Sequence, residues 1–255
     1  MNDARRFGNT IKRLPIVFCL DVSPSMGWDI DNRDIIPMEL LNNSVNTFIR
    51  EINSDGRTRS SAEVSYVTFS TDIEVDSPFI PARNLDNIHL RPVSEGGTNM
   101  AQAVLRSYQK LEERVNEYVR SGIRFNVPFF VLVTDGNPDD NDDGYLQEQA
   151  IATVNAHCHS HQGASGLVIP FIVGVGKRVD SKTLLRYSQG FTNGFFHIRG
   201  DSEQVQTCFS DVFRVISNST KASVHLNLST DAIVDTIRAT MNKGLDDLDR
   251  ELAGY

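Results

Sequence analysis

The side chains with the clearest chemical potential follow a short apolar run near the start of the chain. The run from Ile16 to Leu20 begins after Pro15 and breaks abruptly into Asp21, Ser23 and Ser25. A continuous apolar stretch bounded by turn residues is typical of a strand that is buried on both faces. The three oxygen-bearing side chains after it suit Mg²⁺, Mn²⁺ or Ca²⁺ better than Zn²⁺ or Cu²⁺. The alternative is a turn followed by a helix N-cap, where Asp and Ser are also favoured.

Two distant loops carry oxygen donors of the same kind. A Gly-Gly-Thr sequence ends at Thr98, and either Thr98 or Asn99 would cap a helix predicted over residues 100–119. A second apolar run, residues 128–134, leads directly into Asp135 and a glycine. Each loop therefore places an oxygen-bearing side chain next to a predicted strand or helix end.

The elements around these loops alternate between strands and helices. The apolar spacing predicts strands over residues 16–20, 62–69, 73–80, 128–134, 167–173 and 194–198, and helices over residues 37–52, 100–119, 146–159, 181–188 and 202–218. This alternation predicts an α/β fold, a doubly wound, mostly parallel six-stranded sheet with helices on both faces. The three-residue link between residues 69 and 73 indicates a hairpin, so one edge strand is expected to be antiparallel.

This topology relates the distant loops to one another. In the common doubly wound order the first strand lies beside the fourth, and ligands bind outside the carboxyl ends of the strands at that switch point. The first predicted strand ends at Asp21 and the fourth at Asp135. The loop with Thr98 feeds the helix that leads into the fourth strand. We therefore expect Asp21, Ser23, Ser25, Thr98 and Asp135 to gather at one edge of the sheet.

The same residues resemble the metal-ion-dependent adhesion site of von Willebrand factor A domains, over roughly residues 12–218. The matching residues, in chain order, are Asp21, Ser23, Ser25, Thr98, and Asp135 with Gly136. The resemblance implies that Ser23, Ser25 and Thr98 offer hydroxyls to a Mg²⁺, Mn²⁺ or Ca²⁺ ion directly. It implies that Asp21 and Asp135 act through bound waters and those hydroxyls. A partner protein would then complete the ion's shell with a Glu or Asp, in place of a water.

Within that family, the sequence looks most like the bacterial TerY-type proteins, which are associated with tellurium resistance and stress signalling. The similarity lies in Arg13-Leu14-Pro15 and in the segment from Val133 to Gly136. It implies a non-enzymatic scaffold for kinase and phosphatase partners. The chain departs from the pattern in two ways: Pro24 stands where the family usually has Gly, and no cysteine-rich zinc-binding tail is present.

Composition narrows the class of protein. The 255 residues are 40% hydrophobic and 23% charged, with a formal net charge of −8. This balance argues against nucleic acid or an anionic membrane as a partner. Cys19, Cys158 and Cys208 each fall in a predicted strand or helix, which favours reduced thiols. The start of the chain lacks an apolar signal segment and no stretch has the length of a membrane span, so we predict a cytoplasmic protein.

The predicted domain organisation has three parts. Residues 1–12 form a polar lead-in and residues 13–219 the von Willebrand factor A-like domain. Residues 220–255 form a C-terminal extension, with a strand expected over 224–228 and helical spacing after it. The extension would pack on the domain or dock a partner.

An enzymatic alternative uses the same residues. A metal-dependent hydrolase or phosphotransferase would act through Asp21 and Asp135, but phosphotransferases with an aspartate nucleophile carry a second carboxylate where this chain has Ser23. A serine nucleophile needs a base within hydrogen-bond reach. Neither His89 nor His197 lies on an element that is predicted near the site. We therefore predict that the protein is not an enzyme.

Two other motifs are incomplete. The acidic loop from Asp139 to Gly144 matches the first half of a calcium-binding loop, but its twelfth position is Ala150, where a bidentate Glu is required. His157 and His161 are spaced four apart, as zinc ligands on one helix often are, yet no other cluster completes four ligands. A solvated acidic loop and a polar helix end are the favoured interpretations.

Overall fold

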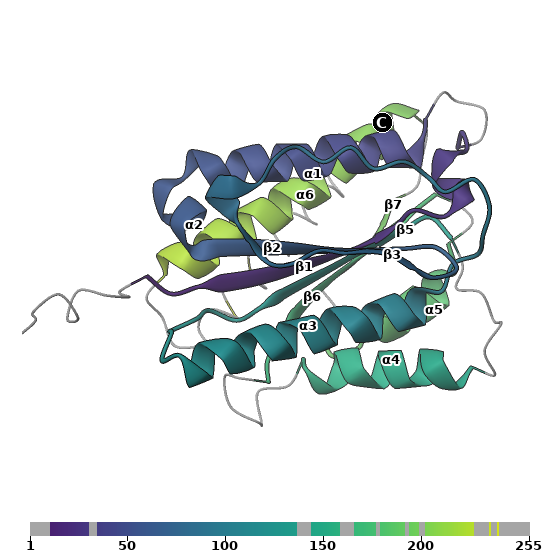
Figure 1. Cartoon of the computed structure of the whole chain (residues 1–255). Helices are drawn as coiled ribbons and strands as arrows, with labels where there is room; N and C mark the ends of the chain where they lie inside the picture. The colour runs from purple at the N-terminus through teal and green to yellow at the C-terminus, as the bar shows by residue number, and fades with distance from the viewer. Residues whose placement is uncertain are drawn as a thin grey trace, which may run out of the picture.

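A mixed sheet separates two layers of helices, with α1, α2 and α6 on one face and α3, α4 and α5 on the other (Figure 1). The computed structural model describes residues 11–30, 35–136, 144–158, 166–176, 179–191, 194–198 and 202–226, with Asp235 and Ala239. Within these residues the strands are β1 Leu14–Asp21, β2 Ala62–Phe69, β3 Ile73–Asp76, β4 Ile80–Pro81, β5 Phe129–Thr134, β6 Ile169–Val175 and β7 Phe195–Ile198. The helices are α1 Pro37–Ser54, α2 Gly56–Ser61, α3 Met100–Arg120, α4 Tyr145–Ala156, α5 Ser181–Tyr187 and α6 Ser202–His225, with short 3₁₀ turns η2 Pro24–Gly27 and η3 Ala82–Asn84.

The predicted topology is confirmed. The strand order is β3-β2-β1-β5-β6-β7, so β1 lies between β2 and β5 and pairs with both in parallel. Every residue of β1 is buried, as its apolar run indicates. On one face the Phe18 ring meets the rings of Phe48 in α1, at 5.1 Å between centroids, and Phe213 in α6, at 6.3 Å. Burying each such apolar side chain contributes about 1.5–3 kcal/mol, so β1 anchors the helical layer that contains α1 and α6.

The sheet has seven strands rather than the expected six. The segment predicted as one strand over residues 73–80 is divided into β3 and β4, both antiparallel to β2. Pro78 follows β3 and has no backbone N–H for the ladder. At the break the Ser77 hydroxyl accepts a hydrogen bond from the Tyr66 backbone N–H at 2.8 Å, which keeps this segment attached to β2.

Residues 56–61, which fall between the predicted helix over 37–52 and the predicted strand over 62–69, form a further helix, α2, which is capped by the Asp55 side chain accepting from Thr58 N–H at 2.7 Å. One expectation near the end of the chain was wrong. Val224 and His225, expected in a strand, belong to α6, so the expected domain boundary after residue 219 falls inside a helix. The helix continues because its inward face buries small hydroxyl side chains where the apolar residues stop, at Ser219, Thr220 and Ser223.

Among the helices in the described part of the chain, none combines the length and hydrophobicity that crossing a membrane requires.

Candidate metal centre

The structure brings all five predicted site residues to the carboxyl edge of β1 and β5. These strands are parallel neighbours, with Leu20 opposite Val133, so the residues that follow them emerge side by side. Asp21, Ser23, Thr98 and Asp135 are buried, and Ser25 is partly exposed. The edge therefore presents a polar cluster at the end of an apolar core.

A chain of hydrogen bonds joins the first and last of the loops. The Ser23 backbone N–H donates to Asp21 Oδ1 at 2.8 Å, and the Ser23 and Ser25 hydroxyl oxygens lie 3.1 Å apart. The Ser25 hydroxyl then donates to Asp135 Oδ1 at 2.9 Å. Residues more than a hundred positions apart in the sequence are thus in direct contact.

The local backbone speaks against a simple helix cap. Ser23 precedes the short 3₁₀ turn η2, but its side chain makes no capping hydrogen bond. Its hydroxyl faces Ser25 instead. Pro24, the departure from the family pattern, stands at the first position of η2, where its fixed φ is favourable and no N–H is needed.

Thr98 lies next to Gly136, close to the Asp21 carboxylate. A Cβ added at Gly136 would lie 3.4 Å from Thr98 Oγ1 and 3.9 Å from Asp21 Oδ2, so the missing side chain leaves a small space bordered by both oxygens. Asn99, rather than Thr98, caps α3 by accepting from Gln102 N–H. The loop is held by the β2–β3 turn, where Thr71 Oγ1 accepts from Gly97 N–H at 2.7 Å.

Sequence reasoning missed Thr134, the last residue of β5. Its hydroxyl donates to Asp21 Oδ2 at 2.5 Å and accepts from Gly136 N–H at 3.2 Å. With the Ser23 N–H on the other oxygen, both oxygens of the Asp21 carboxylate are fixed. The available signal was a threonine at the end of a buried apolar strand, directly before Asp135.

The donor set fits a hard divalent cation. Neighbouring ligands in an octahedral magnesium shell of about 2.0–2.1 Å lie about 2.8–3.0 Å apart, close to the 3.1 Å between the hydroxyl oxygens of Ser23 and Ser25. Within the described residues, no group of three His, Cys, Asp or Glu side chains is placed to hold a metal ion. A cation at this edge would therefore be held mainly by hydroxyls, with Asp21 and Asp135 as the nearby acids.

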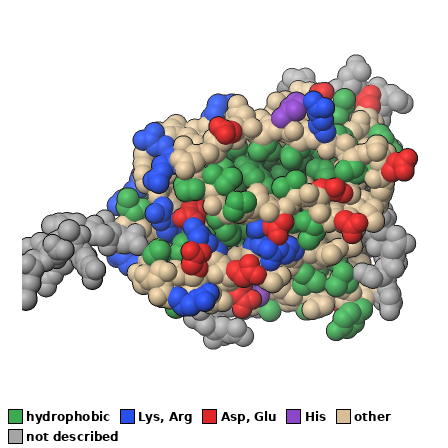
Figure 2. Space-filling view, viewed as in Figure 1, with side chains coloured by type: hydrophobic (Ala, Val, Ile, Leu, Met, Phe, Trp, Pro, Cys, Tyr) green, Lys and Arg blue, Asp and Glu red, His purple; other side chains and the backbone are tan. Residues whose placement is uncertain are grey.

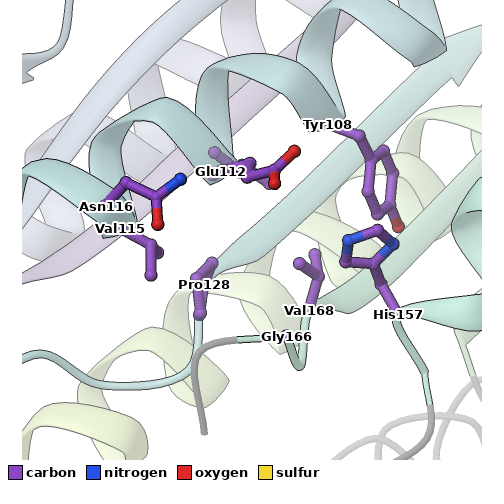
Figure 3. A pocket seen from close by; sticks show the side chains of 9 residues that line it. Tyr108, Glu112, Val115, Asn116, Pro128, His157, Gly166 and Val168 are labelled. Atoms are coloured by element: carbon purple, nitrogen blue, oxygen red, sulfur yellow. The ribbon is translucent and has the colours of Figure 1, made fainter. Parts of the chain in front are cut away.

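The weaker motifs do not form a second metal centre in the described residues. His157 is the C-cap of α4; its Nδ1–H donates to Thr153 O at 2.8 Å, and its ring lies 5.2 Å from that of Tyr108. Figure 3 shows the Tyr108 and His157 side chains next to each other; with Glu112 they are among the residues that line a hollow of about 190 Å³. His161 and the acidic loop from Asp139 lie outside the described residues.

In the described part of the chain, no imidazole is hydrogen-bonded to the site serines. The side-chain hydrogen bonds of Ser23 and Ser25 join these two residues to each other and to Asp135. His197 Nδ1 accepts from the Ser181 hydroxyl at 2.7 Å and its Nε2–H donates to Gly176 O at 2.9 Å, both near β6 and β7. His89 is exposed in the loop after η3.

Comparisons with known proteins agree with this fold. A family model, the von Willebrand factor type A domain, matches residues 16–211. Among solved structures, the chain resembles the PilB minor pilin from Streptococcus sanguinis (16% identity, TM-score 0.53, covering 82% of this chain and 62% of that one). It also resembles the von Willebrand factor type A protein from Catenulispora acidiphila (14%, 0.53, 83% and 43%) and the pilus adhesin SpaC from Lactobacillus rhamnosus GG (12%, 0.57, 85% and 31%).

The structural likenesses are at low sequence identity and establish the fold alone. The chain spans less than two thirds of each of these three proteins. No curated protein sequence matches it. The family model, however, covers well over half of the 255 residues. The chain therefore belongs to the von Willebrand factor type A domain family.

Proposed function

We propose that this domain is a non-enzymatic protein-interaction module that binds its partner through a divalent cation at the carboxyl edge of β1 and β5. The observation that carries this proposal is the hydrogen-bonded chain from Asp21 through Ser23 and Ser25 to Asp135. Among the described residues, it gathers hydroxyls with two acids and no histidine. Such a set suits holding an ion more than catalysing a reaction.

In this proposal the site side chains have two different roles: some bind the ion directly, and others orient its ligands. Ser23, Ser25 and Thr98 would hold the ion through hydroxyl oxygens, which carry no charge to neutralise it. Asp21 and Asp135 would orient these hydroxyls and bound waters. When bound, Mg²⁺, Mn²⁺ or Ca²⁺ supplies a positive centre that attracts a Glu or Asp of the partner.

Hydrogen bonds from the protein fix the orientation of the Asp21 carboxylate. The Ser23 N–H and the Thr134 hydroxyl hold its two oxygens in place in a fully buried position. Ser25, which is partly exposed, marks the side from which a partner's side chain would approach.

We also propose a cytoplasmic role in a bacterial stress-response or tellurium-resistance system, with a kinase or phosphatase as partner. The support is the resemblance of Arg13-Leu14-Pro15 and of the segment from Val133 to Gly136 to TerY-type proteins. An interaction role is consistent with the relatives as well, because SpaC is a pilus adhesin and PilB a minor pilin.

The test separates ion binding from partner binding. Calorimetry with Mg²⁺ and Mn²⁺ should show binding to the wild type and a large loss in Thr98→Ala. It should show no loss in Thr47→Ala, the matched control, because Thr47 is a partly exposed threonine of α1 whose hydroxyl donates to Asn43 O. A partner captured from a bacterial extract in Mg²⁺ should be released by EDTA and should not bind Thr98→Ala. Equal capture in EDTA, or by Thr98→Ala, would contradict the proposal.

A further inference from the structure

A second hollow lies at the opposite edge of the sheet, where β1 begins. Its volume is about 280 Å³, and its basic lining comes from four separate segments, with Lys12 before β1, Arg57 in α2, Arg124 after α3 and His225 at the end of α6. Since β1 has eight residues, at about 3.3 Å each its two ends lie about 23 Å apart. The hollow is therefore distinct from the site at Asp21.

Two cationic side chains of the lining have no partner among the described residues. Lys12 and Arg57 make no hydrogen bond or ion pair with any residue in the described part of the chain. Ser61, which is 2% exposed, lies in the wall of the same hollow and adds a hydroxyl group to it.

The charge of this end contrasts with the rest of the molecule. The chain has 33 acidic residues against 25 basic ones, yet Figure 2 shows Lys and Arg side chains gathered at the end where β1 begins. Asp55, which contacts the lining residue His225, is already engaged, since its Oδ1 accepts from Thr58 N–H at 2.7 Å and lies 2.9 Å from His225 Nε2. Among the described residues, the positive charges of Lys12 and Arg57 are therefore not neutralised by an ion pair.

We propose that this hollow binds a phosphate monoester carried on a small organic group, such as a phosphorylated side chain. A phosphate monoester carries about −1.5 to −2 charges and three acceptor oxygens, which matches a lining of donors. The planar fork of Arg57 suits two phosphate oxygens at once, while Lys12 supplies a point charge. Val224 and Leu226 give the hollow an apolar side for the carbon atoms of the ligand.

The volume of the hollow and the net charge of the chain exclude larger anionic ligands. A hollow of about 280 Å³ takes a phosphate group with a few further atoms, and is small for a nucleotide. Nucleic acid and anionic membranes need an extended positive surface, and the net charge of −8 opposes their approach.

In the test, the full chain is titrated with O-phospho-L-serine at low salt, and binding is measured by calorimetry and by NMR chemical-shift changes. The wild type is expected to bind. Its affinity should fall about tenfold in Arg57→Ala, because a charge-assisted contact is lost, and should fall less in Arg57→Lys. Arg59→Ala is the matched control, since Arg59 is exposed on the same helix but does not line the hollow. It should bind like the wild type, and L-serine should not bind.

The proposal would be overturned if Arg57→Ala bound phosphoserine as tightly as the wild type, or if Arg59→Ala lost as much affinity as Arg57→Ala. It would also be overturned if inorganic phosphate bound as tightly as phosphoserine, or if the protein bound phosphatidylserine vesicles but not phosphoserine. Thermal melting of each variant checks that it is folded. Arg57→Ala should keep the wild-type magnesium affinity, so failure here and failure of the proposed ion site are distinguishable.

Discussion

Replacing Asp21 by Asn tests whether the charge of this carboxylate, rather than its shape, is what the site requires. Asp21 is fully buried and accepts from Ser23 N–H at 2.8 Å and from the Thr134 hydroxyl at 2.5 Å. In Asp21→Asn the amide oxygen can still accept from Ser23, and the Thr134 hydroxyl can rotate to accept from the new NH₂ group. We therefore expect the metal-free variant to fold, with a free energy of unfolding within about 1 kcal/mol of the wild type.

The effect on ion binding should be much larger. A ligand at a hundred times its Kd stabilises the folded state by about 2.7 kcal/mol. Each kcal/mol raises the Tm of a domain of this size by about 2–4 °C, so Mg²⁺ at that concentration should raise the wild-type Tm by about 5–11 °C. Loss of a residue that supports metal ligands typically weakens affinity by about 10–100-fold. At the upper end only about 0.4 kcal/mol of stabilisation would remain in Asp21→Asn at the same Mg²⁺ concentration.

The assay is thermal unfolding in MgCl₂ and in EDTA, with calorimetry to give each Kd. Asp86→Asn is the matched control, because Asp86 is an exposed acid in the loop after η3 and its loss changes the net charge equally. The control should keep the full magnesium-induced rise in Tm. If Asp21→Asn also keeps it, the carboxylate is not part of an ion site and the reasoning is refuted.

Two further predictions concern stability. Glu63→Gln should lower the free energy of unfolding by about 3 kcal/mol in urea titrations. The buried Glu63 accepts from Arg114 Nε at 2.9 Å, and the variant removes the buried negative charge of this pair, leaving Arg114 its contact with the more exposed Glu117. A loss below about 0.5 kcal/mol would contradict this prediction. Hydrogen bonds from Thr58, and then from His225, lower the pKa of Asp55 from 3.8 to about 2. Because the pKa of Asp55 is lower in the folded state than in the unfolded state, its carboxylate stabilises the fold above about pH 4, and this stabilisation is lost as the pH falls toward 2. In Asp55→Ala the free energy of unfolding should therefore depend less steeply on pH between these values. An unchanged slope would show that Asp55 does not titrate in this way.

The sequence by itself was enough to predict the central strand and the place of the site. A strand buried on both faces must be apolar throughout, so the run from Ile16 to Leu20 identified β1, and every residue from Leu14 to Asp21 is buried. Alternating strands and helices require parallel pairing, and the carboxyl ends of parallel neighbours meet at one edge. This is why the contact between the loops of Asp21 and Asp135 could be predicted without coordinates.

Local signals failed where polar residues are buried. The apolar pattern of α6 ends at Ile216, yet the helix continues to His225 because Ser219, Thr220 and Ser223 are small enough to pack inward. Thr134 was missed for a related reason. It was predicted as the last residue of a strand, and only the pairing of β5 with β1 places its hydroxyl against the Asp21 carboxylate.

Only the tertiary structure decided which residues from distant segments meet. Thr98 and Asn99 are equally good caps in sequence, and the contact of the loop with the β2–β3 turn assigns the cap to Asn99 and leaves Thr98 beside Gly136. The basic hollow draws on four segments, and no periodic pattern connects Lys12 to Arg57. Periodicity reports which face of an element is buried, whereas the position of one element against another depends on long-range packing, which a single sequence does not display.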